Sequence, residues 1–143
     1  MLEFQNKFIE EASELIEGIE SELISLESNP DDKLIIDKIF RVMHTLKGTA
    51  SMFGFNSIES ITHQLETIYD LIRDDQLKIS EDIVNTTFDT IDLIKKILGT
   101  KNKLSKKDQK LFNEILNRIN RISGIHEETE PLSPNKNNIE AWD

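Results

Sequence analysis

The chain has 143 residues and a formal net charge of −10, and 37% of its residues are hydrophobic. This length suits one domain with a core of modest size. The acidic balance argues against a nucleic-acid-binding protein, and the absence of cysteine excludes disulfides, thiolate metal sites and cysteine nucleophiles. No apolar run approaches the roughly 20 residues of a membrane span, and the first residues lack the pattern of a signal peptide. We therefore expect a cytoplasmic protein that binds other proteins, without nucleic acid and without membrane insertion.

Five segments in chain order carry apolar residues at steps of three and four, which is the spacing of an amphipathic helix. They span residues 2–28, 32–52, 57–75, 80–98 and 105–123. Because the connections between them are short, we predict an all-α fold, an antiparallel up-down four-helix bundle with an additional C-terminal fifth helix on its end or side. The phenylalanines, Phe4 included, and Met52 are expected in the core.

Side chains suited to helix capping support these boundaries. The predicted N-caps are Asp31 or Asp32 for the second helix, Asn56 with Glu59 for the third, Ser80 for the fourth, and Ser105 with Asp108 for the fifth. Glycine often follows the last turn of a helix, so Gly99 and Gly124 are predicted stops. The bundle is thus predicted over 1–123, and 124–143 reads as a flexible acidic and polar linker or the start of a following region.

The candidate site lies in the stretch M-H-T-L-K-G-T-A-S-M-F-G-F, which begins at Met43. His44 stands beside the apolar stripe of the second helix, so its side chain should be partly open to water. Helix side chains lean toward the N-terminus, and a glycine at Gly48 therefore leaves the imidazole uncovered. Close packing of two helices would also explain a mid-helix glycine, and both explanations stay open.

The predicted hairpin of the second and third helices brings further groups to this histidine. His44 stands eleven residues before Phe55 and Glu66 stands eleven after it, while Lys47 and His63 are each eight residues away. Positions equally far from the turn lie at about the same height, so His44 can face Glu66 and Lys47 can lie near His63. His63 can equally be an ordinary helix-edge histidine.

This set of groups suits a phosphorylated histidine. A carboxylate that accepts the proton of one ring nitrogen fixes the tautomer, and the other nitrogen keeps a lone pair that can attack phosphorus. The carboxylate also stabilises the positive charge that develops on the ring. A lysine one turn away can offset charge on the transferring phosphoryl group.

The motif resembles that of a known family. H-T-L-K-G from His44 and S-M-F-G-F from Ser51 are similar to the H-S-x-K-G…F-G-F signature of histidine-phosphotransfer domains. Within that family the chain is most similar to the N-terminal phosphotransfer domain of chemotaxis histidine kinases of the CheA type. F-I-E-E-A-S-E-L-I from Phe8 and T-H-Q-L-E from Thr62 also match. Thr49 departs from the pattern, which usually has a smaller residue there.

The resemblance implies a phosphoryl carrier. It implies that His44 is the phosphorylated nucleophile, that Glu66 orients it, that Lys47 and His63 complete the polar network, and that Gly48 leaves room for the incoming domain. The implied partners are a histidine kinase catalytic domain, which would bind ATP and Mg, and response-regulator receiver domains with an acceptor aspartate. No cofactor is expected in this chain, which has no glycine-rich phosphate loop. A stand-alone carrier and the front of a CheA-like kinase both stay open; in the second case the parent protein would be a histidine protein kinase.

Two other functions compete with this one. A carboxylate-bridged di-metal bundle needs Glu-x-x-His on two helices. Three positions before the chain's histidines (the third, His126, is taken as incidental) stand Arg41, Ser60 and Ser123, so that motif is absent. A helical interaction adaptor without phosphotransfer explains the bundle but not the histidine, glycine and carboxylate together.

Overall fold

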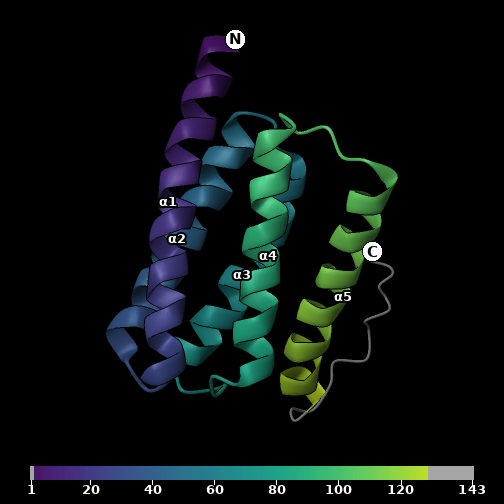
Figure 1. Ribbon diagram of the computed structural model, residues 1–143. Helices are drawn as coiled ribbons and strands as arrows, with labels where there is room; N and C mark the ends of the chain where they lie inside the picture. Colours follow the sequence, from purple (N-terminus) through teal and green to yellow (C-terminus); the bar gives the residue numbers. More distant parts are fainter. Residues whose placement is uncertain (1, 129–143) are drawn as a thin grey trace.

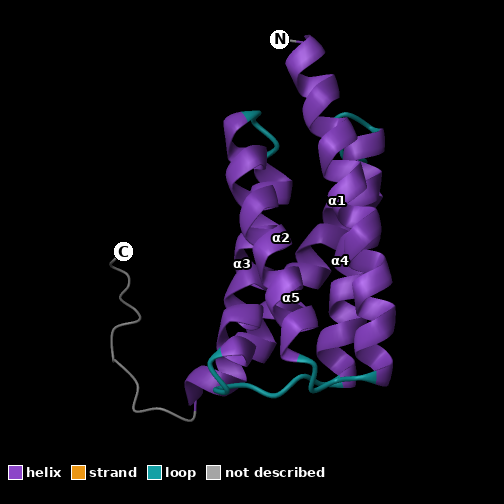
Figure 2. Cartoon of the chain, turned by 90° about the vertical axis from the view of Figure 1, so that its left-hand side faces the viewer, coloured by secondary structure: helices purple, strands orange, loops and turns teal. Residues whose placement is uncertain are grey.

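The computed structural model describes residues 2–128, which form five helices: α1 (Leu2–Ser28), α2 (Lys33–Met52), α3 (Asn56–Arg73), α4 (Glu81–Gly99) and α5 (Lys106–Glu128). The first four form an antiparallel up-down bundle in which α1 packs on α2 and α4, and α3 packs on the same two helices (Figure 1). The fifth helix lies along the side of the bundle, against α3 and α4. Figure 2 shows helices joined by loops, without strands in the described part. The predicted fold class is confirmed.

One hydrophobic core joins the apolar stripes of all five helices. Two residues predicted in it are exposed instead: Phe4 is 61% exposed and Met52 is 80% exposed. Phe4 lies in the first turn of α1, where this helix extends beyond the rest of the bundle (Figure 1). Met52 follows the buried Ala50 by two residues, which places it about 200° around the helix and therefore away from the core. No helix within residues 2–128 combines the length and apolarity needed to cross a membrane.

Three predicted N-caps are present and one is wrong. Asp32 accepts hydrogen bonds from the amides of the first turn of α2, Ser80 accepts one from Ile83, and Ser105 accepts one from Asp108. At the start of α3, by contrast, Phe55 occupies the N-cap position and makes no side-chain cap, and Asn56 is already helical. Phe55 is buried with its ring 4.8 Å from that of Phe8, so aromatic packing fixes this helix start.

The predicted stop at Gly124 is wrong, because α5 continues to Glu128. A single glycine inside a helix costs only about 1 kcal/mol relative to alanine, and Gly124 does not take the left-handed conformation of a C-cap. Gly54 does take it, with φ of 78°, and there the Phe55 amide donates back to the Ala50 carbonyl at 2.9 Å, which ends α2. The first residues of the predicted linker are therefore helical, and residues 129–143 lie outside the described part.

Candidate functional site

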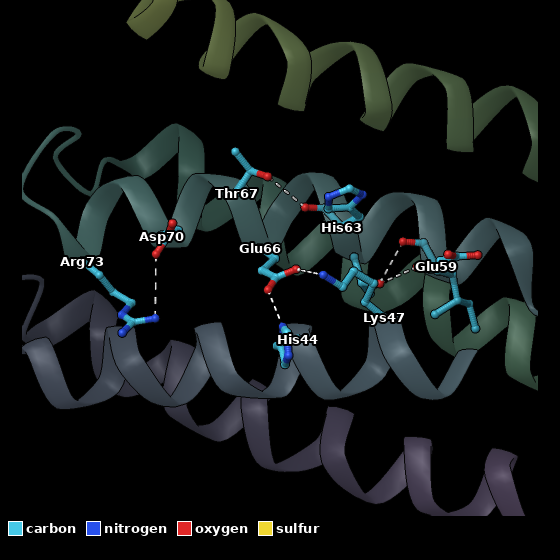
Figure 3. A network of polar contacts seen from close by, with 10 residues as sticks. His44, Lys47, Glu59, His63, Glu66, Thr67, Asp70 and Arg73 are labelled. Atoms are coloured by element: carbon cyan, nitrogen blue, oxygen red, sulfur yellow. Dashed lines mark hydrogen bonds and ion pairs between the residues drawn. The ribbon is translucent and has the colours of Figure 1, made fainter. Parts of the chain in front are cut away.

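The α2–α3 hairpin brings His44 and Glu66 into direct contact. The imidazole Nδ1 of His44 lies 2.6 Å from Oε2 of Glu66 (Figure 3). Both residues stand eleven positions from Phe55, and equal rise along two antiparallel helices places them at the same height. The contact predicted from the sequence is present.

The two partners differ in their exposure to water. Glu66 is buried, with 8% of its surface exposed, whereas the side chain of His44 is 64% exposed. Burial alone raises the pKa of the Glu66 carboxyl, but Lys47 and His44 outweigh this effect and lower the pKa. Glu66 is therefore an ionised carboxylate at neutral pH. The residue is buried in the bundle, and its carboxylate faces the imidazole of His44.

An ionised carboxylate can only accept hydrogen bonds, and this decides the state of the ring. Nδ1 of His44 carries the proton and donates it to Glu66, so a neutral ring keeps its lone pair on Nε2. Within residues 2–128, Nε2 has no hydrogen-bond partner. The exposed edge of the imidazole is thus a nucleophile directed toward solvent.

Lys47 completes the environment of the carboxylate. Its Nζ lies 2.8 Å from Oε1 of Glu66, the oxygen that His44 does not contact. No donor in the described part meets Oε1 with the geometry of a directed hydrogen bond, so the contact is a close ion pair. Only 27% of the Lys47 side chain is exposed, which limits the screening of this charge by water.

Gly48 opens the surface next to the histidine. A Cβ atom built on Gly48 would meet no atom within 4 Å, so close packing of another helix does not require a glycine here. Of the two explanations open at the sequence level, only the free space beside His44 agrees with this geometry. The surface one turn after the imidazole is therefore bare backbone.

His63 is not joined to the other predicted site residues. Its side chain points outward from α3 (Figure 3), and its carbonyl accepts a hydrogen bond from Thr67 at 3.2 Å. In the described part of the chain its ring makes no hydrogen bond or ion pair. The structure thus brings together His44, Lys47 and Glu66, with Gly48 beside them, and leaves His63 outside this group.

Phe40 and Arg73 lie beside the site, although the sequence did not point to them as functional residues. The rings of Phe40 and His44 are 6.2 Å apart between centroids and 17° from parallel, and Arg73 Cζ lies 4.0 Å from the Phe40 centroid. The four-residue spacing of Phe40 and His44 was the available signal. Residues 2–128 contain no cluster of three side chains suited to hold a metal ion.

Comparison with known proteins agrees with this geometry. The sequence matches the Hpt domain family over residues 3–124. It is 37% identical over 98 residues to the sensor histidine kinase CheAY of Helicobacter pylori, a match that covers 68% of this chain and 12% of that protein. The chain thus spans about an eighth of this relative's length.

Two solved structures extend the comparison. The CheA phosphotransferase domain of Thermotoga maritima is 33% identical, with a TM-score of 0.69 over 72% of this chain and 98% of that one. The phosphorylated P1 domain of CheA3, in a complex with CheY6 from R. sphaeroides, shares the fold with a TM-score of 0.71 at 20% identity, over 85% of this chain and 99% of that one. Family match, shared fold and the arrangement around His44 agree, and the chain belongs to the Hpt domain family.

Proposed function

We propose that His44 carries a phosphoryl group on Nε2. One observation supports this most directly: the buried, ionised Glu66 binds Nδ1 and leaves the lone pair on the exposed Nε2. Membership of the Hpt domain family supports the same role, that of a phosphoryl carrier in chemotaxis two-component signalling. An adaptor without phosphotransfer would have no use for a carboxylate held inside the bundle to orient a surface imidazole.

The transfer involves one bond made and one broken. The Nε2 lone pair forms a bond to the donor's phosphorus, and the bond from phosphorus to the leaving group breaks, with the electron pair going to that group. The ring becomes cationic, and Glu66 stabilises this charge through the proton on Nδ1. The Lys47 ammonium contacts the same carboxylate as His44, and from there it can offset negative charge on the phosphoryl oxygens. We assign His63 no step, since no hydrogen bond or ion pair joins its ring to these groups.

The partners follow from this chemistry and from the relatives. We propose that a histidine kinase catalytic domain, with ATP and Mg bound to it, donates the group, and that a response-regulator aspartate removes it. In the second step a carboxylate oxygen attacks phosphorus and the electron pair of the P–N bond returns to Nε2. The complex of a related P1 domain with CheY6 supports a receiver-type acceptor. By the same reasoning the parent protein is a cytoplasmic histidine kinase of the CheA type.

A small phosphodonor tests the proposal without a partner. Phosphoramidate transfers its phosphoryl group to the imidazole of a histidine, which gives phosphohistidine and releases ammonia as the P–N bond of the donor breaks. The 143-residue chain is expected to gain one acid-labile phosphoryl group on His44, located by fragment mass spectrometry. His44→Gln should gain none there, while His126→Gln should react like the wild type. Labelling of His44→Gln to the wild-type level would show that the assignment is wrong.

Transfer from a kinase provides the second test. With a CheA-type catalytic domain and labelled ATP, Glu66→Ala is expected to be phosphorylated roughly 10- to 100-fold more slowly, by analogy with carboxylates that orient metal-bound histidines. Circular dichroism should show an unchanged helix content. Wild-type kinetics in a folded Glu66→Ala protein would remove Glu66 from the mechanism.

A further inference from the structure

The hydrogen bond to Glu66 fixes only one atom of the His44 ring. An imidazole held at Nδ1 can still swing about that contact, because its side chain is 64% exposed. Phe40 stands one turn earlier on α2, and helical residues four apart are neighbours on one face. Its ring runs nearly parallel to the imidazole, 17° apart, with the centroids 6.2 Å apart. This is an offset-stacked arrangement in which Phe40 flanks His44 on the side away from the α2–α3 turn.

Arg73 holds the Phe40 ring from the neighbouring helix. Its guanidinium Cζ lies 4.0 Å from the centroid of the ring, at the distance of a cation–π contact. The guanidinium is itself held by Asp37, 3.3 Å from Nε, and by Asp70, 3.8 Å from the nearest terminal nitrogen. Figure 3 shows Arg73 reaching across to α2, with Asp70 above it on α3 and a dashed line joining the two. Phe40 is thus fixed by α3 at one face while it lies alongside the imidazole.

We propose that Phe40 is a positioning residue for His44, and that Arg73 acts through it by holding the phenyl ring against α3. The inference rests on the proposed function, because it concerns the nucleophile of that reaction. A fixed phenyl ring limits the swing of the imidazole, keeps Nδ1 on Glu66, and so keeps the lone pair on Nε2. Phe40 then acts through its flat, rigid ring, which restricts the imidazole of His44, as well as through its apolar character at the edge of the core.

The test compares side chains that differ in the ring but not in apolarity. Phe40→Leu keeps an apolar, helix-compatible residue and removes the ring, whereas Phe40→Tyr retains it. Phe88→Leu is the matched control, since Phe88 is also a partly buried phenylalanine on a helix and packs against the core away from the site. Unfolding curves show whether each protein is folded before the reactivity is compared.

The first measurement is the tautomer of His44. Ring ¹⁵N chemical shifts separate a protonated nitrogen from one with a lone pair, at about pH 8.5, well above the ordinary titration range of imidazole. The wild type, Phe40→Tyr and Phe88→Leu are expected to hold the proton on Nδ1. Phe40→Leu is expected to shift part of the population to the Nε2–H form. An unchanged tautomer in a folded Phe40→Leu protein would overturn the proposal.

The second measurement is the rate with phosphoramidate, a donor too small to need a docking surface. Phe40→Leu should react several-fold more slowly than the wild type, and Phe40→Tyr should restore the rate. If Phe40→Leu slows transfer from a kinase by raising KM and leaves the phosphoramidate rate unchanged, Phe40 is a docking contact and the proposal fails. If the wild type gains no phosphoryl group on His44, the proposed function fails; a labelled wild type with an equally reactive Phe40→Leu refutes the positioning role alone.

A double-mutant cycle tests the part of Arg73. Arg73→Met should slow the reaction less than Phe40→Leu does, and should add no further loss once Phe40 is leucine, because Arg73 acts through the ring. Arg41→Met is the matched control, since Arg41 also pairs with Asp37, at 2.7 Å, but is not stacked on Phe40. Additive losses would overturn the role of Arg73. If Phe40→Leu does not fold, Arg73→Met leaves the ring in place, and an unchanged tautomer and rate there contradict the proposal.

Discussion

Lys47 and Glu66 meet although they stand at different distances from the α2–α3 turn. Lys47 is eight residues before Phe55 and Glu66 is eleven after it, yet Nζ lies 2.8 Å from Oε1. Helix side chains lean toward the N-terminus of their own helix. On α2 this carries Lys47 away from the turn, on α3 it carries Glu66 toward the turn, and the two side chains meet between the two levels (Figure 3). The Glu66 carboxylate therefore contacts the imidazole of His44 through one oxygen and the ammonium of Lys47 through the other.

Replacing Lys47 should slow phosphorylation without unfolding the bundle. Lys47→Met keeps an unbranched apolar stem and removes the charge, and we expect a rate reduced by roughly tenfold at most, because the ammonium is paired with Glu66, which offsets part of its field at the phosphoryl oxygens. Lys38→Met is the control: Lys38 is also on α2 but pairs with Glu22 of α1, 3.4 Å away. Rates measured with phosphoramidate and with a kinase donor should both fall for Lys47→Met. Equal rates in the two variants would make Lys47 a bystander.

The lowered pKa of Glu66 predicts how stability depends on pH. A carboxyl whose folded-state pKa lies below its unfolded value, ordinarily 4.5, favours folding when it is ionised. Its contribution is fully present above that value and is lost as the pH falls through the lowered folded-state pKa. Glu66→Gln cannot titrate there. The Tm of the wild type minus the Tm of Glu66→Gln should thus be constant near neutral pH and fall as the pH drops below 4.5. If the wild-type Tm instead rises relative to that of Glu66→Gln on acidification, the pKa of Glu66 is not lowered in the folded protein.

The order of the helices and the contact between His44 and Glu66 could be predicted because both follow from local periodicity and from counting away from one turn. The same count places Lys47 opposite His63, but it does not reveal that Lys47 pairs with Glu66, since a backbone count ignores the direction in which long side chains lean. Arg73 shows the same effect. Phe40 is fifteen residues before Phe55 and Asp70 is fifteen after, but Arg73, one turn further on, leans back to cover the phenyl ring.

The helix ends show a different limit of the sequence. Asp32, Ser80 and Ser105 cap as predicted, because a side chain that bonds its own first turn needs no distant partner. The start of α3 depends on tertiary packing, since burial of Phe55 against Phe8 decides where the helix begins. The residues around positions 55 and 56 give no indication of that contact, because its partner is far away in the sequence.

Gly48 should separate stability from access. In Gly48→Ala the new methyl group meets no atom within 4 Å, so the substitution should stabilise α2 by up to about 1 kcal/mol. We nevertheless expect slower transfer from a kinase domain, because the methyl group covers backbone beside His44 that an incoming domain approaches. The rate of phosphorylation by the small donor phosphoramidate should fall less.

Gly18→Ala is the matched control for this effect. Gly18 is also inside a helix, α1, with nothing within 4 Å of a built Cβ, and it lies outside the α2–α3 hairpin that carries the histidine. Denaturant unfolding should show a similar gain in both variants, with transfer from the kinase slowed only in Gly48→Ala. Equal transfer rates would show that the space above Gly48 is not used.

The buried pair of Tyr69 and Thr87 should respond unequally to the loss of either hydroxyl. Thr87 Oγ1 donates its only proton to the Ile83 carbonyl at 2.8 Å, so Tyr69 must donate to Thr87 across 2.7 Å. Tyr69→Phe leaves no donor without an acceptor and should cost about 1 kcal/mol, whereas Thr87→Val strands the buried Tyr69 hydroxyl and should cost about 1–3 kcal/mol. Thr90→Val is the control, because Thr90 is equally buried and its hydroxyl bonds, among residues 2–128, only the Thr86 carbonyl. Urea unfolding should rank Thr87→Val as the most destabilised of the three; a cost no larger than that of Thr90→Val would contradict the assigned direction of the hydrogen bond.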